Sequence, residues 1–195
     1  MKHVKFRPWK GDNYEQIPQS KKLLILGDSH YCAKDKNRND ACRSKGDCSY
    51  DCMNDCCYKM THNLIRDEYL EFRSGRKKSE GYLQTILTFE KNLFGYTPSP
   101  QESINFWNSV IFYNYIQHSQ YKPRSRRKTE AEEIDDYKEA FKEVLAEYQP
   151  DYIIIWSKFL FTQDWLPDGA FEAPDYTLNA EYNGVIYNTP VRTFK

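Results

Sequence analysis

The sequence predicts one α/β domain, a three-layer α/β/α sandwich built around a short, mainly parallel central sheet. Three short apolar runs have the length and composition of buried strands: Lys22–Gly27, Ser109–Asn114 and Asp151–Trp156. Segments with helical periodicity separate these runs, which is typical of parallel strands joined by crossover helices. The length of 195 residues suits a single domain with a buried core.

The first predicted strand ends in residues that can carry chemistry. Its apolar run stops at Gly27, and Asp28, Ser29, His30 and Tyr31 follow directly. Open α/β sheets bind ligands just beyond the carboxyl ends of their parallel strands. We therefore expect the functional site at this end of the strand.

A polar insertion follows at about residues 32–58 and contains all six cysteines of the chain. Cys48, Cys52 and Cys56 recur every four residues, so a helix would place them on one stripe. The preceding loop would supply a fourth cysteine. Thiolate-rich sites hold zinc or iron–sulfur clusters. Reduced, partly buried thiols and a disulfide pair are the alternatives. The predicted metal ligands are Cys42, Cys48, Cys52 and Cys56, with Cys32 as an alternative to Cys42 and with Cys57 or His62 available beyond the stripe.

Helical periodicity returns around Asn63–Phe72 and again over Tyr82–Phe94. In the second segment one apolar stripe is predicted, formed by Tyr82, Ile86, Phe89, Leu93 and Phe94. Gly95 and the segment Pro98–Pro100 are expected to end this second helix. A third helix is predicted over Thr129–Tyr148, because a threonine followed three residues later by glutamate is a capping-box pattern.

Toward the end of the chain, the pattern predicts further short elements. Ser157–Trp165 is typical of a short helix. The dipeptide Asn183–Gly184, between two segments that favour strands, predicts a β-hairpin. Val191–Phe194 is predicted as a final strand.

Charge and hydropathy exclude several kinds of partner. The 28 basic residues balance the 28 acidic ones, so global charge attracts neither nucleic acid nor an anionic membrane. Met1–Pro8 lacks the apolar segment of a signal peptide, and no apolar run approaches the roughly 20 residues of a spanning helix. We therefore expect a cytoplasmic protein that has no membrane partner.

Local charge favours a different partner. Five of the seven residues from 122 to 128 are cationic, and phosphate contacts from such a loop would bind nucleic acid in a salt-dependent way. A solvated charged turn is the alternative interpretation. The candidate nucleic-acid-binding residues are Lys122, Arg124, Arg126, Arg127 and Lys128.

Two family resemblances compete for the segment after the first strand. Gly27–His30 resembles the first block of the SGNH esterases, in which Ser29 would be the nucleophile. That family takes its base from an Asp-x-x-His pair near its C-terminus, and His3, His62 and His118 form no such pair.

A wider resemblance is to divergent members of the uracil-DNA glycosylase superfamily. It is carried by four segments in the right order: Pro8–Tyr14, Leu24–Tyr31, Phe106–Tyr115 and Phe141–Trp156. The resemblance implies a domain that binds a nucleobase or nucleic acid, DNA rather than RNA, and that hydrolyses an N-glycosidic bond. A non-catalytic nucleic-acid-binding module is the remaining alternative.

The superfamily resemblance also implies roles for individual residues. Asp28 or His30 would position water, while Ser29 stands where the best-known branch has its water-activating aspartate. Tyr31 would form one side of the base pocket, and Gly27 would also line it. Asn114 matches the asparagine that hydrogen-bonds the base, because a side-chain amide offers a donor and an acceptor. The family's His-Pro-Ser-type segment follows its last strand, and this sequence ends where that segment would begin.

The cysteine pattern generates a prediction about metal content. If the stripe of cysteines forms a site, purified protein should contain about one equivalent of zinc or iron, because three or four thiolates bind these metals tightly. Elemental analysis measures this directly. Metal-free protein would leave reduced thiols or a disulfide as the explanation of the insertion.

Overall fold

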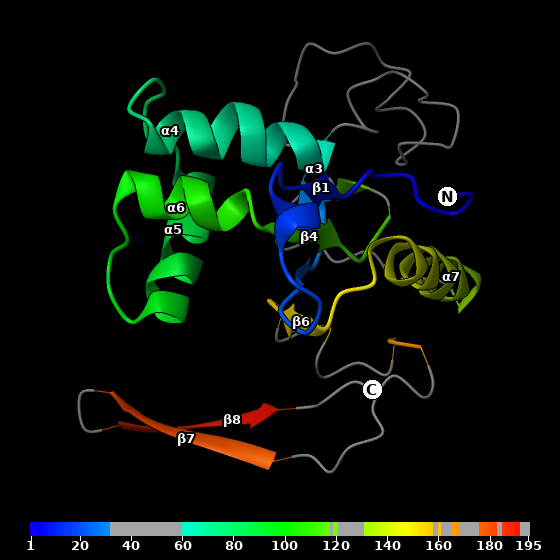
Figure 1. Ribbon diagram of the computed structural model, residues 1–195. Helices are drawn as coiled ribbons and strands as arrows, with labels where there is room; N and C mark the ends of the chain where they lie inside the picture. The colour runs from blue at the N-terminus through cyan, green and yellow to red at the C-terminus, as the bar shows by residue number, and fades with distance from the viewer. Residues whose placement is uncertain are drawn as a thin grey trace.

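The computed structural model describes residues 1–31, 60–117, 119–120, 131–157, 160, 165–167, 176–182 and 185–191. These residues form a mixed α/β fold (Figure 1). The strands are β1 (Trp9–Lys10), β2 (Leu23–Gly27), β3 (His30–Tyr31), β4 (Val110–Asn114), β5 (Ser119–Gln120), β6 (Tyr152–Ile155), β7 (Tyr176–Tyr182) and β8 (Val185–Val191). The helices are η1 (Tyr14–Gln16), α3 (Met60–Asn63), η2 (Leu64–Leu70), α4 (Glu71–Arg73), α5 (Gly81–Phe94), α6 (Pro100–Trp107) and α7 (Ala131–Tyr148).

The three predicted core strands are neighbours in one sheet. In the described residues its order is β1-β4-β2-β6, with β2 parallel to both β4 and β6. The short strand β1, which the sequence pattern did not predict, adds antiparallel to the outer edge of β4 and makes the sheet mixed. Because the three core strands are parallel, they all end at the same edge of the sheet.

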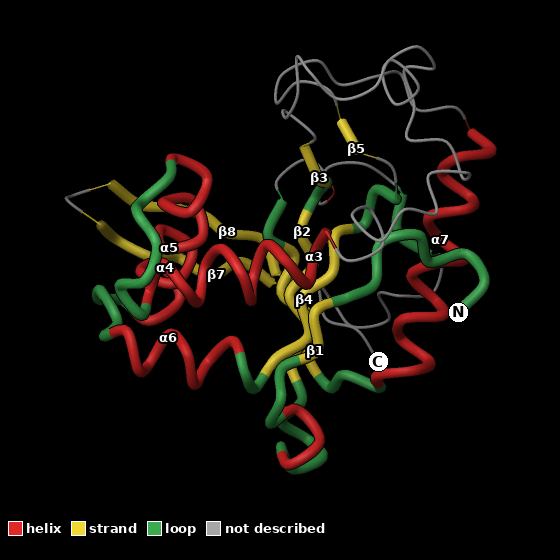
Figure 2. The backbone as a smooth tube through the Cα atoms, turned by 90° about the horizontal axis from the view of Figure 1, so that it is seen from above, coloured by secondary structure: helices red, strands yellow, loops and turns green. Residues whose placement is uncertain are grey.

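Each face of this sheet carries its own apolar cluster. Leu24 and Leu26 of β2 belong to the cluster that includes the buried face of α7. Ile25, which points the other way because strand side chains alternate, packs with residues of η2, α5 and α6. Figures 1 and 2 show α7 on one side of the sheet and α3 to α6 on the other.

The helices before β4 differ in two ways from the sequence prediction. The segment expected to be helical around Asn63–Phe72 is helical, but η2 is wound as a π-helix. Pro98–Pro100 does more than end the preceding helix, because Ser99 and Glu102 form a capping box and Pro100 begins α6. The prediction missed α6, since it interpreted the two prolines only as a stop.

Helix α5 ends as predicted, at Gly95 in the left-handed conformation with φ of +76°. Its predicted apolar stripe is partly wrong. Tyr82 and Leu93 are exposed, and the tyrosine hydroxyl instead donates to Glu68 Oε2 at 2.7 Å. The buried positions are Leu83, Ile86, Leu87, Phe89 and Glu90.

The C-terminal hairpin is confirmed, since β7 and β8 pair antiparallel with Tyr182 opposite Val185. Its turn at Asn183–Gly184 lies outside the described residues, as do Thr129, most of Ser157–Trp165 and all of the predicted last strand except Val191. In the part of the chain that is described, no helix is both long enough and apolar enough to cross a membrane.

A buried polar network joins α4, α5 and α6. Glu90 is fully buried and accepts hydrogen bonds from Ser103 Oγ and Trp107 Nε1, both at 2.6 Å. Ser103 Oγ in turn accepts from Arg73 Nε at 2.8 Å, which links the carboxylate to a guanidinium through one hydroxyl. This network holds α5 and α6 together on the face of the sheet that they cover.

We predict that Glu90→Leu lowers the free energy of unfolding by about 2–4 kcal/mol, because two buried donors lose their acceptor. Glu90→Gln should have a smaller effect, since its amide oxygen still accepts one of the two bonds. Urea unfolding measures both. Lys91→Ala, at the exposed neighbouring position, is the control and should stay within about 0.5 kcal/mol of the parent. Equal stability of Glu90→Leu and the parent would contradict the role of this network.

Candidate functional site

The residues after the three parallel strands meet at one edge of the sheet, as expected. Gly27 lies opposite Asn114 in the β2–β4 register. Beyond the ladder, Tyr115 N donates to Gly27 O at 3.0 Å and Trp156 N donates to Leu26 O at 2.7 Å. The hydrogen bonds of the sheet therefore position this edge directly.

Gly27 is needed because the Asn114 side chain lies over the end of β2. A Cβ atom at Gly27 would come within 2.1 Å of Asn114 Oδ1 and 3.0 Å of Phe112 Cε2. Any larger residue would displace the amide. Asn114 is 4% exposed in this position, so its side chain is packed within the edge rather than presented to solvent.

His30 is the second member of this polar cluster and is also 4% exposed. Its Nε2 lies 2.6 Å from Thr61 Oγ1 of α3, and Asn114 Nδ2 lies 3.1 Å from Nε2 and 3.3 Å from Nδ1. A tautomer that donates from Nε2 to Thr61 leaves Nδ1 to accept from the asparagine amide. In that tautomer both ring nitrogens are used within the protein.

Burial also sets the protonation state of this ring. The pKa of His30 is lowered to about 3 because the charged form would lose its hydration in the interior. The imidazole is therefore neutral at pH 7 and does not gain a second proton near that pH. This chemistry suits a residue that positions Asn114 and does not suit a general acid or base.

Gln117 ties the N-terminal segment to the same edge. Its Oε1 accepts from Lys5 N at 2.9 Å and Phe6 N at 3.1 Å, and its Nε2 donates to Asn114 O at 2.7 Å. The Phe6 ring then packs edge-on against the imidazole of His30, with 4.9 Å between ring centroids. The amide of Gln117 thus fixes both the backbone after β4 and one wall around His30.

Sequence analysis missed Thr61 and Gln117 as parts of this site. The bond between Thr61 and His30 joins residues 31 positions apart in the sequence. The bonds of Gln117 to the N-terminal segment join residues more than 110 positions apart, so no local pattern marks either side chain.

Asp28 and Ser29 lie between the end of β2 and β3, and both are half-buried. The backbone of Tyr31 pairs with Gln120 in the short parallel ladder of β3 and β5. The ladder extends the site away from the main sheet.

The described histidines are engaged away from Ser29. His3 bonds to Glu143, His30 bonds to Thr61 and Asn114, and the His62 ring packs against Trp9 at 5.0 Å. In this part of the chain Ser29 therefore lacks the histidine contact that would activate a serine nucleophile. His118 lies outside the described residues.

The predicted metal ligands and the basic loop are not among the described residues. Cys42, Cys48, Cys52 and Cys56 lie in the gap between Tyr31 and Met60, and residues 122–128 lie in the gap before α7. Within the ranges that are described, no three His, Cys, Asp or Glu side chains are grouped so that they could hold a metal ion.

Comparisons with protein families, with curated proteins and with solved structures give no match to this chain.

We predict that His30 makes stability depend on pH. Its pKa is near 6.5 in the unfolded chain and about 3 in the folded protein, so between these values only the unfolded state is protonated. Stability is complete above about pH 6.5 and falls as pH decreases, by about 2 kcal/mol between pH 7 and pH 5. Urea unfolding at the two pH values measures the loss, and His30→Gln should reduce it.

The NMR signals of the His30 ring give an independent check that does not depend on the variant. They should stay constant between pH 7 and pH 5, because the ring remains neutral. A titration of these signals with a midpoint near pH 6.5 would contradict the buried, hydrogen-bonded state.

Proposed function

We propose that this chain is a nucleobase- or nucleic-acid-binding domain with the three-layer α/β/α arrangement of the uracil-DNA glycosylase superfamily. One observation carries the proposal: Gly27 and Asn114 meet at the carboxyl edge of adjacent parallel strands, where α/β proteins bind their ligands. The apolar clusters on both faces of the sheet support the layered arrangement.

In this proposal Asn114 recognises the base. Its Nδ2 donates to His30 in the unliganded protein, and a base carbonyl takes the place of the imidazole as acceptor when ligand binds. Gly27 leaves room for the amide at the strand end. Exchanging one internal hydrogen bond for one to the ligand keeps the buried amide satisfied in both states.

Hydrolysis of an N-glycosidic bond would depend on Asp28. His30 is neutral and bonded at both ring nitrogens, so a water-activating role falls to the half-buried carboxylate beside it. Ser29 and Tyr31 would line the approach to the base. Asp28→Asn should then abolish base release while leaving binding in place.

Nucleic acid, and DNA in particular, is the proposed partner because of the basic loop. The loop follows β5, and β5 pairs with β3 directly after the residues of the site. In this proposal the loop binds phosphates while the sheet edge binds a base. The net charge of zero leaves this local patch as the source of electrostatic attraction.

We predict salt-dependent binding to a fluorescein-labelled, single-stranded oligonucleotide that contains uracil. Replacement of Arg124, Arg126 and Arg127 together by Ala should make the fall of log affinity with log salt concentration less steep. The slope should change by about 2, since each phosphate contact contributes about 0.7. Asn114→Ala should leave the slope unchanged and reduce discrimination between bases. Fluorescence anisotropy at several salt concentrations measures both effects.

A variant with Lys78, Lys91 and Lys142 changed to Ala removes the same charge from exposed positions elsewhere, and its salt slope should match that of the parent. Absence of binding by the parent at low salt would overturn the proposed function. Hydrolysis of an activated ester that disappears in Ser29→Ala would favour a serine esterase instead.

A further inference from the structure

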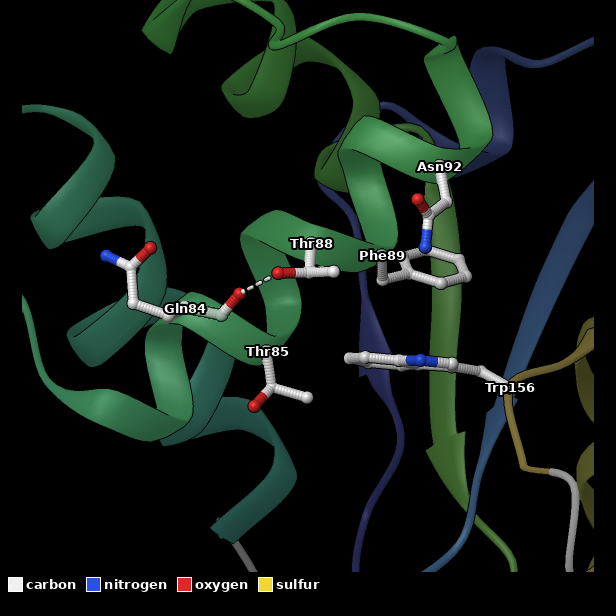
Figure 3. Close-up of a pocket in the computed structure, with 6 residues that line it drawn as sticks. All are labelled: Gln84, Thr85, Thr88, Phe89, Asn92 and Trp156. Carbon is white, nitrogen blue, oxygen red and sulfur yellow. Dashed lines mark hydrogen bonds between the residues drawn. The ribbon is translucent and has the colours of Figure 1, made fainter. Parts of the chain in front are cut away.

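A cavity opens beside the sheet, between α5 and the residue that follows β6. It has a volume of about 490 Å³ and is lined by Gln84, Thr85, Thr88, Phe89, Asn92 and Trp156 (Figure 3). Cavities of this size accommodate small organic ligands or a part of a larger one. Unlike Asn114, four of its six lining residues are exposed, so a ligand can reach them without rearrangement.

Trp156 forms the aromatic wall of this cavity. Its indole is half-buried and packs against Phe89, with 4.5 Å between ring centroids and 33° between ring planes. Figure 3 shows the phenyl ring over one face of the indole. A second contact, with Phe112 at 6.2 Å, holds the indole from the sheet side. The ring is therefore a fixed platform, on which a flat ligand can stack with little loss of side-chain entropy.

Polar side chains of α5 form the opposite wall. Gln84, Thr88 and Asn92 follow one another at intervals of four residues and so lie on one stripe of the helix. Thr88 Oγ1 donates to Gln84 O at 2.8 Å, which leaves its hydroxyl oxygen as an acceptor. Among the described residues the Asn92 amide has no hydrogen-bond partner, so both its donor and its acceptor are available to a ligand.

None of the residues that line this cavity is ionisable. A charged ligand would gain no counter-charge here, whereas a neutral ring with donors and acceptors on its edge would find both an aromatic face and matching amides. Nucleobases have these properties, and they stack on aromatic side chains while hydrogen-bonding through their edges. The composition of the wall thus favours a neutral heteroaromatic ring.

The cavity lies on the same face of the sheet as the Gly27 site. Phe112, which contacts Trp156, is also the ring that a Cβ atom on Gly27 would approach to 3.0 Å. One phenyl ring therefore separates the two places. Trp156 N also bonds to Leu26 O, so both belong to the same edge of the sheet.

We propose that the cavity between α5 and Trp156 is a binding site for a neutral nucleobase, which stacks on the indole and hydrogen-bonds to Asn92. This inference rests on the proposed function for its ligand class. It places an accessible base site next to the closed Asn114 cluster.

The test uses uridine and adenosine, which carry no phosphate and therefore do not depend on the basic loop. Each nucleoside is titrated into the full chain, and the indole Nε1–H signal of Trp156 and the side-chain amide signals of Asn92 are followed by NMR. Both sets of signals should shift in a saturable way. Trp156→Leu should weaken binding about tenfold or more, since the stacking surface is lost.

Two further variants separate stacking from hydrogen bonding. Trp156→Phe keeps an aromatic face and should retain part of the affinity. Asn92→Ala should change the preference between the two nucleosides, whereas Lys91→Ala, on the adjacent exposed position of the same helix, should bind as the parent does.

The possible failures are distinguishable. If nucleosides shift the Trp156 signal but the protein binds no oligonucleotide, the base site is supported and the proposed nucleic-acid function is overturned. Oligonucleotide binding without any nucleoside-induced shift at Trp156 or Asn92 would overturn the base site alone. Shifts produced by an N-acetylglucosamine oligomer and not by nucleosides would also overturn it, because the cavity would then be a carbohydrate site.

Discussion

The parallel pairing of β2 with β4 is the constraint on which the rest of the site depends. It sets Gly27 opposite Asn114, and the missing side chain of the glycine is the space that the amide occupies. A shift of one residue in this register would turn every apolar side chain of β2 to the opposite face. The two apolar clusters oppose such a shift, so core packing and site geometry are maintained by the same ladder.

Two kinds of polar environment result at this edge. Around Asn114 the hydrogen bonds are closed among His30, Thr61 and Gln117, which makes the cluster stable but leaves it little contact with solvent. Beside Trp156 the amide of Asn92 has no hydrogen-bond partner among the described residues, whereas Gln84 Nε2 donates to Ser79 Oγ at 2.6 Å. The hydrogen bonds around Asn114 are satisfied in the folded protein without a ligand, because buried polar groups need partners. In the proposed function, a ligand would therefore bind first at the cavity beside Trp156.

Much of the fold could be predicted because buried strands have a strong local signal. The runs at β2, β4 and β6 are continuous and apolar, and the structure pairs all three in one sheet. Helix α6 was missed although its capping box is present in the sequence, since two prolines also mark the end of α5. The two-residue strand β1 has too little pattern to be recognised, and its place depends on the free edge of β4.

The sequence by itself determined which three segments form the parallel strands and which chemical groups follow them. It predicted all three strands as buried, whereas β6 is only partly buried, with Tyr152 60% exposed. Tertiary structure alone decided what those groups do. His30 is a candidate base in the sequence, yet burial lowers its pKa to about 3 and makes it a support for Asn114. Trp156 ends a predicted buried strand, and in the structure it packs against an apolar core cluster while also forming one wall of an open cavity. Local pattern encodes strands because periodicity is a property of neighbouring residues, whereas burial and hydrogen-bond partners depend on residues far apart in the chain.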